Sequence, residues 1–166
     1  MNRPRLLTLT LLAGAFLASA SNAQILDESR KPLATAPAVE YLYPEQVTVP
    51  AHKSTRVELH FRIAPGLHIN SHNPSDKFLI PTELKLPADS GVKLEDAKYP
   101  AGAAFALPAD PDTKLNVYTG EFSIDARVIA EPGDHLVQAK LRYQACDQSQ
   151  CMPPRTITVP IDVIGK

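Results

Sequence analysis

The feature that most constrains the fold of this chain is its proline content. The sequence has 16 prolines among 166 residues, and 15 of them recur from Pro32 to Pro160. Proline has no backbone N–H and its ring clashes with the preceding turn, so the interior of a helix excludes it. Prolines at this frequency rule out long helices and divide the chain into short segments.

Those segments alternate in the way that strands do. Between residues 54 and 63, Val57, Leu59, Phe61 and Ile63 fall on one face and polar side chains on the other. A period of two is typical of a strand with one buried face. The pattern recurs over residues 120–130, 135–143 and 155–164, and shorter candidates cover residues 46–49, 67–70, 82–86, 92–99 and 115–118. Eight or nine short strands separated by turn residues predict an all-β, immunoglobulin-like two-sheet sandwich.

The first 23 residues predict a secretory signal peptide. Two arginines give a basic start, an apolar run follows from Leu6 to Ala20, and small residues allow cleavage after Ala20 or Ala23. The apolar run is too short to span a membrane comfortably. We therefore expect an exported, soluble, periplasmic protein.

The mature chain has little net charge. Removing residues 1–23 leaves 143 residues, enough for one domain with a core. It also removes 2 of the 17 basic residues and none of the 18 acidic ones. The mature chain therefore has 15 basic and 18 acidic residues, and its net charge is −3. This balance does not suit a nucleic-acid-binding protein. We expect a flexible lead-in over residues 24–39 and one monomeric domain over residues 40–166.

The only two cysteines, Cys146 and Cys151, lie between two predicted strands. An exported protein matures where disulfides persist, so the pair is either a structural staple or a redox site. As a staple, so short a ring would contribute about 2 kcal/mol through loop closure. As a redox site, it would need a disulfide that a partner's thiolate can reach. The spacing alone does not decide between the two.

The residues around the cysteines resemble a known family. Tyr143-Gln-Ala-Cys146 runs into Cys151-Met-Pro-Pro154, and two further blocks agree in order, at residues 61–82 and 117–122. Together these blocks resemble the N-terminal periplasmic domain of DsbD, the bacterial thiol:disulfide interchange protein. The resemblance covers roughly residues 40–164.

The resemblance implies a sandwich whose single cysteine pair cycles between dithiol and disulfide. The implied activity is protein-disulfide reductase-type exchange through a mixed disulfide, with no metal or organic cofactor. Cys146 and Cys151 would be the redox pair, with Cys151 as the attacking thiol and Cys146 as the resolving one.

The implied partners are thioredoxin-fold proteins. The acceptors would be periplasmic, such as disulfide isomerases or proteins of cytochrome c maturation. Because the chain ends at Lys166, without the membrane conduit or the thioredoxin-like domain of DsbD, we expect a separate protein to donate the electrons.

Three further residues are candidate neighbours of the site. Strand alternation places His68 and Asn70 on one face, and in the family this strand borders the cysteines, so His68 would tune a thiol pKa. The alternative is a partly exposed histidine at a strand end. Family members shield the disulfide with a cap loop that carries an aromatic residue, and Phe105 is the best candidate here. The alternative is core packing, and residues 99–111 around it are rich in proline and alanine and are not expected to form regular structure.

Two other functions stay open. Cys146, Cys151 and Met152 are soft ligands that suit Cu(I), and His68 or His72 would complete a site, although the chain lacks Met- and His-rich tracts. The other possibility is a non-catalytic, exported binding module whose disulfide stiffens a loop.

Overall fold

Alternating apolar residues build the core of the protein, as a computed structural model shows for residues 37–42, 46–108 and 110–166. The predicted signal peptide and most of the predicted lead-in fall outside these described residues. Within them the chain forms strands and no helix. No helix in these ranges is therefore long and apolar enough to cross a membrane.

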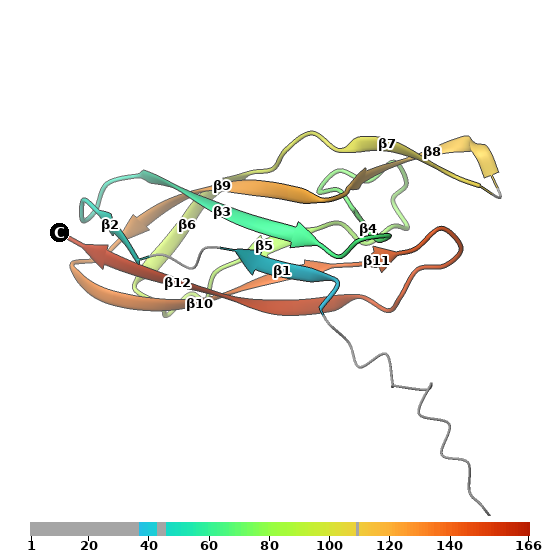
Figure 1. Ribbon diagram of the computed structural model, residues 1–166. Helices are drawn as coiled ribbons and strands as arrows, with labels where there is room; N and C mark the ends of the chain where they lie inside the picture. Colours follow the sequence, from blue (N-terminus) through green and yellow to red (C-terminus); the bar gives the residue numbers. More distant parts are fainter. Residues whose placement is uncertain (1–36, 43–45, 109) are drawn as a thin grey trace, which may run out of the picture. The chain divides into compact units, whose positions relative to one another are not determined.

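Two four-stranded sheets face each other across the core (Figure 1). Sheet A has the order β1-β3-β9-β6, with strands Val39–Leu42, Thr55–Ile63, Glu121–Ala130 and Val92–Lys98. Sheet B has the order β2-β12-β10-β5, with strands Gln46–Val49, Arg155–Gly165, Gly133–Tyr143 and Glu83–Lys85. Strand β2 pairs with β12 in parallel, whereas the other pairs are antiparallel.

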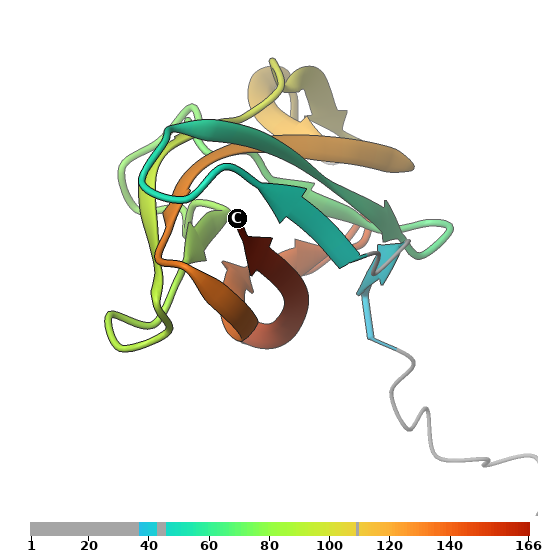
Figure 2. The ribbon, with the colours of Figure 1, turned by 90° about the vertical axis from the view of Figure 1, so that its left-hand side faces the viewer.

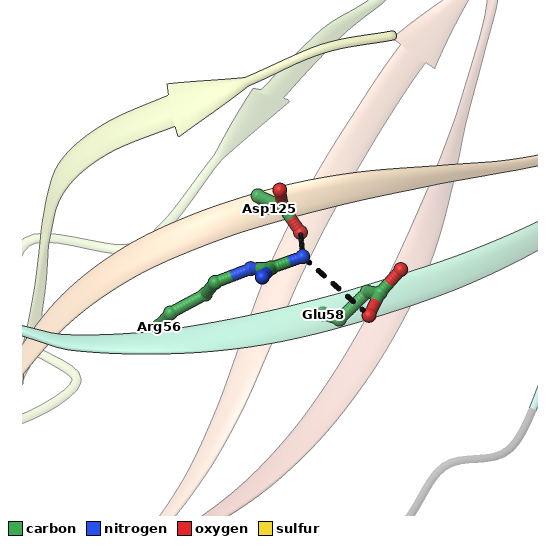
Figure 3. A network of polar contacts seen from close by, with 3 residues as sticks. All are labelled: Arg56, Glu58 and Asp125. Atoms are coloured by element: carbon green, nitrogen blue, oxygen red, sulfur yellow. Dashed lines mark hydrogen bonds and ion pairs between the residues drawn. The ribbon is translucent and has the colours of Figure 1, made fainter.

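The buried faces are those that the alternation predicts. On β3 the buried side chains are Val57, Leu59, Phe61 and Ile63. On β10 they are Val137, Ala139, Leu141 and Tyr143. The outer face of sheet A is polar. There the Arg56 guanidinium lies 2.7 Å from the Asp125 carboxylate on β9 and 3.7 Å from Glu58 (Figure 3). The predicted all-β, immunoglobulin-like sandwich is confirmed.

A third sheet, which the sequence did not predict, lies at the end of the sandwich remote from the C-terminus (Figures 1 and 2). We call it the end sheet, and its order is β11-β4-β8-β7. The strands are Ala145–Cys146, His68–Asn70, Asp110–Tyr118 and Ala103–Leu107. Each of β4, β8 and β11 lies next in sequence to a strand of the sandwich, so the end sheet extends it.

The expectation of irregular structure over residues 99–111 is wrong. Strand β7 and the start of β8 form a hairpin there, with Phe105 opposite Leu115. Pro111 is tolerated because β4 pairs with β8 only at Val117 and Tyr118, so the start of β8 has a neighbour on one side alone. Strand β1 begins at Val39, the last residue of the predicted lead-in.

Candidate functional site

The two cysteines close a tight loop between β10 and β12, at the end of the sandwich. Cys146 is the last residue of β11 and forms an antiparallel bridge with Cys151, with their Cα atoms 3.9 Å apart. Their sulfurs form a disulfide. The two halves of this bond differ in environment, because Cys146 is 1% exposed whereas Cys151 is exposed. Of the two cysteines, Cys151 is therefore the one that solvent reaches.

Asp147 orders the loop between the cysteines. Its carboxylate accepts hydrogen bonds from the backbone N–H of Ser149 at 2.7 Å, from that of Gln150 at 2.8 Å and from the Ser149 hydroxyl at 2.8 Å. The Asp147 N–H donates to the Gln150 carbonyl at 3.0 Å. These hydrogen bonds favour the charged form and lower the pKa of Asp147. An aspartate that accepts hydrogen bonds from the backbone two and three residues ahead is common in turns, and here it orders the turn that precedes Cys151.

Strand register places a row of polar side chains beside Cys146. In the antiparallel pairing of β11 with β4, Cys146 lies opposite His68, and the backbone N–H of Asn70 donates to the Gln144 carbonyl at 3.4 Å. Side chains two residues apart share a face, so Cys146, His68, Asn70 and Gln144 lie on one face of the end sheet. Ile69 and Ala145 face the opposite way, into the core.

Asn70 and Gln144 form a hydrogen-bonded link between two loops. The Asn70 amide nitrogen donates to the Ile80 carbonyl at 3.0 Å and to the Gln144 side-chain oxygen at 3.4 Å. The Gln144 amide nitrogen donates to the carbonyl of Met152, next to Cys151, at 3.2 Å. The far side of the cysteine loop is therefore held through two side-chain amides.

His68 is the polar group closest to Cys146 in this register, and it is 2% exposed. The alternative of a partly exposed histidine at a strand end is therefore wrong. Burial lowers the pKa of His68, and the nearby Asp147 carboxylate acts in the opposite direction. Its Nε2 atom has no hydrogen-bond partner within the described part of the chain.

Phe105 covers His68. The centroids of the two rings are 4.2 Å apart and their planes differ by 34°. Phe105 is only partly buried and is not among the residues of the main core, so the alternative of simple core packing does not hold. Both residues line a surface cleft of about 510 Å³, whose wall also contains Arg62, Glu121 and, between the two cysteines, Gln148.

The sequence matches the family model described as the N-terminal part of the thiol:disulfide interchange protein DsbD, over residues 38–162. The chain belongs to this family. Membership and the Cys146–Cys151 disulfide together identify a domain of the thiol:disulfide exchange class, as the resemblance predicted.

Two solved structures are similar to this DsbD-type domain. The reduced N-terminal domain of DsbD from Neisseria meningitidis is 19% identical with a TM-score of 0.46, and the match covers 69% of this chain and 82% of that one. The N-terminal periplasmic domain of ScsB from Proteus mirabilis is 14% identical with a TM-score of 0.49, over 75% of this chain and 44% of that one. No curated protein matches the sequence.

The copper hypothesis gains no support from the arrangement of side chains. Among the described residues, no three or more His, Cys, Asp or Glu side chains gather in a way that could hold a metal ion. His72, one of the proposed ligands, instead stacks on Tyr99 with ring centroids 3.8 Å apart, and its Nδ1 atom lies 2.9 Å from the Thr82 carbonyl oxygen.

Sequence reasoning missed Gln144. Glutamine is common on protein surfaces and attracts no attention by itself. The available indication was strand alternation, because a residue two positions before a buried cysteine shares its face.

Proposed function

We propose that this protein is an exported, periplasmic thiol:disulfide exchange domain that passes electrons between thioredoxin-fold partners through Cys146 and Cys151. The observation that carries the proposal is the one-sided exposure of the disulfide, with Cys151 open to solvent and Cys146 buried. Exchange proceeds by in-line attack on one sulfur, so a disulfide with one accessible sulfur has one defined entry point.

The oxidised domain would accept two electrons in two steps. A thiolate of the donor attacks the Cys151 sulfur, a donor–Cys151 disulfide forms, and the Cys146–Cys151 bond breaks to release the Cys146 thiolate. A second thiol of the donor, as its thiolate, then attacks the donor sulfur of the mixed disulfide. This releases Cys151 as a thiolate and leaves the donor oxidised and the domain reduced.

The reduced domain would pass the electrons on by the same route in reverse. The Cys151 thiolate attacks the disulfide of an acceptor, forms a mixed disulfide and releases one acceptor thiolate. Cys146 then attacks Cys151, which re-forms the intramolecular disulfide and releases the second acceptor thiolate. Cys151 is therefore proposed as the attacking thiol and Cys146 as the resolving one.

The surroundings of the disulfide support exchange over a purely structural staple. Phe105 covers His68, the residue opposite Cys146, which suits a disulfide that is shielded on its buried side and open at Cys151. Asn70 and Gln144 support the loop and hold it without the disulfide having to do so. A staple would need neither a cover nor a separate hydrogen-bonded frame.

The reduction potential of the Cys146–Cys151 pair tests the proposal. The purified protein would be equilibrated in graded thiol/disulfide buffers, after which free thiols are alkylated and counted by mass. We expect roughly −200 to −270 mV, the range of exchange proteins, whereas a value below about −300 mV would identify a structural disulfide. The double variant Cys146→Ser/Cys151→Ser is the matched control, and we expect it to stay folded. If it unfolded, the disulfide would be a staple.

A further inference from the structure

His68 lies in the site but has no role in the exchange steps proposed above. It lies opposite Cys146 in the β4–β11 pairing, and both side chains are almost fully buried. Directly opposed residues of an antiparallel pair have neighbouring side chains on one face of the sheet. His68 has a ring contact with Phe105, but its Nε2 atom has no hydrogen-bond partner among the described residues. The packing therefore fixes this ring beside Cys146 and leaves one of its nitrogen atoms free to take up or give up a proton.

The exchange cycle needs a proton carrier at this position. Only a thiolate attacks a disulfide, and burial away from water favours the neutral thiol. Cys146 must therefore lose a proton before it can resolve a mixed disulfide on Cys151. It must regain one after it has left as a thiolate. Cys151 has no such need, because water reaches it directly.

We propose that His68 accepts the proton of the Cys146 thiol in the resolving step and returns it when Cys146 leaves as a thiolate. The inference rests on the proposed exchange function and deepens it. In the forward step the S–H proton moves to the imidazole, the Cys146 sulfur bonds to Cys151, and the acceptor's sulfur departs with the electron pair. The imidazolium then releases its proton to solvent or to that departing thiolate. No oxidant or cofactor beyond the two proteins is required.

Burial keeps the His68 ring neutral, which is the form that can accept a proton. The Asp147 carboxylate, next to Cys146, would stabilise the imidazolium once it forms. Across the cleft, Arg62 and Glu121 form an ion pair with each other at 2.9 Å. From β8 the nearest titratable group is Tyr118, which pairs with Ile69 and so faces the core side of the end sheet.

The test follows the mixed disulfide itself. The reduced protein would be mixed with oxidised glutathione between pH 6 and 9.5, quenched with acid, and analysed by mass for glutathione on Cys151. His68→Phe keeps a ring under Phe105 but removes both nitrogens. We expect it to slow resolution roughly tenfold at pH 7, at the lower end of general acid–base effects. The difference should vanish near pH 9.5, where hydroxide deprotonates Cys146 without help. His72→Phe, the matched control, also removes a stacked histidine and should behave like the native protein.

Three outcomes separate the hypotheses. An unchanged rate, or the same slowing at every pH, would overturn the role of His68, because a merely structural change has no reason to disappear at high pH. Failure of oxidised glutathione to convert the native dithiol to either the Cys151 adduct or the Cys146–Cys151 disulfide would instead overturn the exchange function. If His68→Phe does not fold, the His68 ring of the native protein can be titrated by NMR in both redox states. A proton partner of Cys146 must titrate differently in the dithiol and disulfide forms, and identical titrations would refute the proposal.

Discussion

The rings of His68 and Phe105 lie 4.2 Å apart, and this contact joins the strand beside Cys146 to a hairpin that is remote from it in sequence. The hairpin of β7 and β8 extends beyond the part of β8 that pairs with β4. Phe105 is thus held over His68 by a hairpin that pairs only within the end sheet and not with either sheet of the sandwich. The cysteine, the histidine and the covering ring therefore all belong to strands of the end sheet.

Phe105→Ala should uncover His68 and, through it, the Cys146 side of the disulfide. We expect reduction by glutathione to become roughly fivefold faster, because this access adds to the access that the exposed Cys151 already gives. Stopped-flow measurement with excess thiol would give the rate. The control is Phe78→Ala, since the Phe78 side chain is 81% exposed and its removal changes surface apolar area without uncovering the cysteines. An equal effect of both changes would mean that Phe105 is no cover.

The two single-cysteine variants should differ in reactivity. With Cys146→Ser, the exposed Cys151 should form a stable mixed disulfide with an oxidised thioredoxin-fold protein, because no resolving thiol is present. With Cys151→Ser, the buried Cys146 should react at least about tenfold more slowly. Non-reducing gels and intact mass would detect the adducts. Equal trapping by both variants would contradict the assignment of Cys151 as the entry point.

The sandwich could be predicted from sequence because its strands alternate. Strands β3 and β10 each bury every second side chain, as the pattern around Leu59 and Leu141 indicated. The β7–β8 hairpin gives no such pattern, since its residues face solvent over most of their length and carry no apolar alternation. The end sheet was missed as a sheet, although residues 67–70 and 115–118 were predicted to be strands. Its edge strand β11 has only two residues and shows no period, and no sequence pattern indicates that β4, β8 and β11 pair with one another.

The candidate site could be predicted only as far as neighbours in sequence define it. The cysteine pair was visible at once, and strand alternation placed His68 and Asn70 on one face. The burial of His68 was not predictable, because it depends on the distant Phe105. The pairing of Asn70 with Gln144 likewise joins segments that only the folded chain brings together.

The Asn70–Gln144 pair should contribute to stability. We expect Asn70→Ala and Gln144→Ala each to cost about 1–3 kcal/mol in free energy of unfolding, because each leaves a carbonyl of Ile80 or Met152 without its donor. The double variant should cost less than the sum of the two, since the residues share one network. Urea unfolding followed by fluorescence or circular dichroism would measure all three.

Gln138→Ala is the control for this cycle. Gln138 is an exposed glutamine on the neighbouring strand β10, and a surface change of this kind should stay within about 0.5 kcal/mol. Strict additivity of Asn70→Ala and Gln144→Ala would show that the two amides act separately, and the hydrogen-bonded link would then carry no energy of its own.

The buried His68 should make stability depend on pH in a defined direction. Its folded-state pKa lies below the ordinary value of about 6.5 because burial opposes the charge. In the pH window between these two values the unfolded chain binds a proton that the folded protein does not bind. The free energy of unfolding must therefore fall as pH drops through 6.5 toward the lowered pKa of His68, and it must recover as pH rises again.

His68→Phe removes this proton and should flatten that part of the profile. Urea midpoints of the native protein and the variant at pH 7.5, 6.0 and 5.0 would show it, with the variant gaining on the native protein as the solution becomes more acidic. The Asp147 carboxylate contributes in a different range, because its lowered pKa makes its stabilisation disappear only when pH falls below the ordinary range of aspartate. Parallel profiles for the two proteins between pH 7.5 and 5.0 would mean that the pKa of His68 is the same in the folded and unfolded states. The His68 side chain would then not be buried beneath Phe105 in solution.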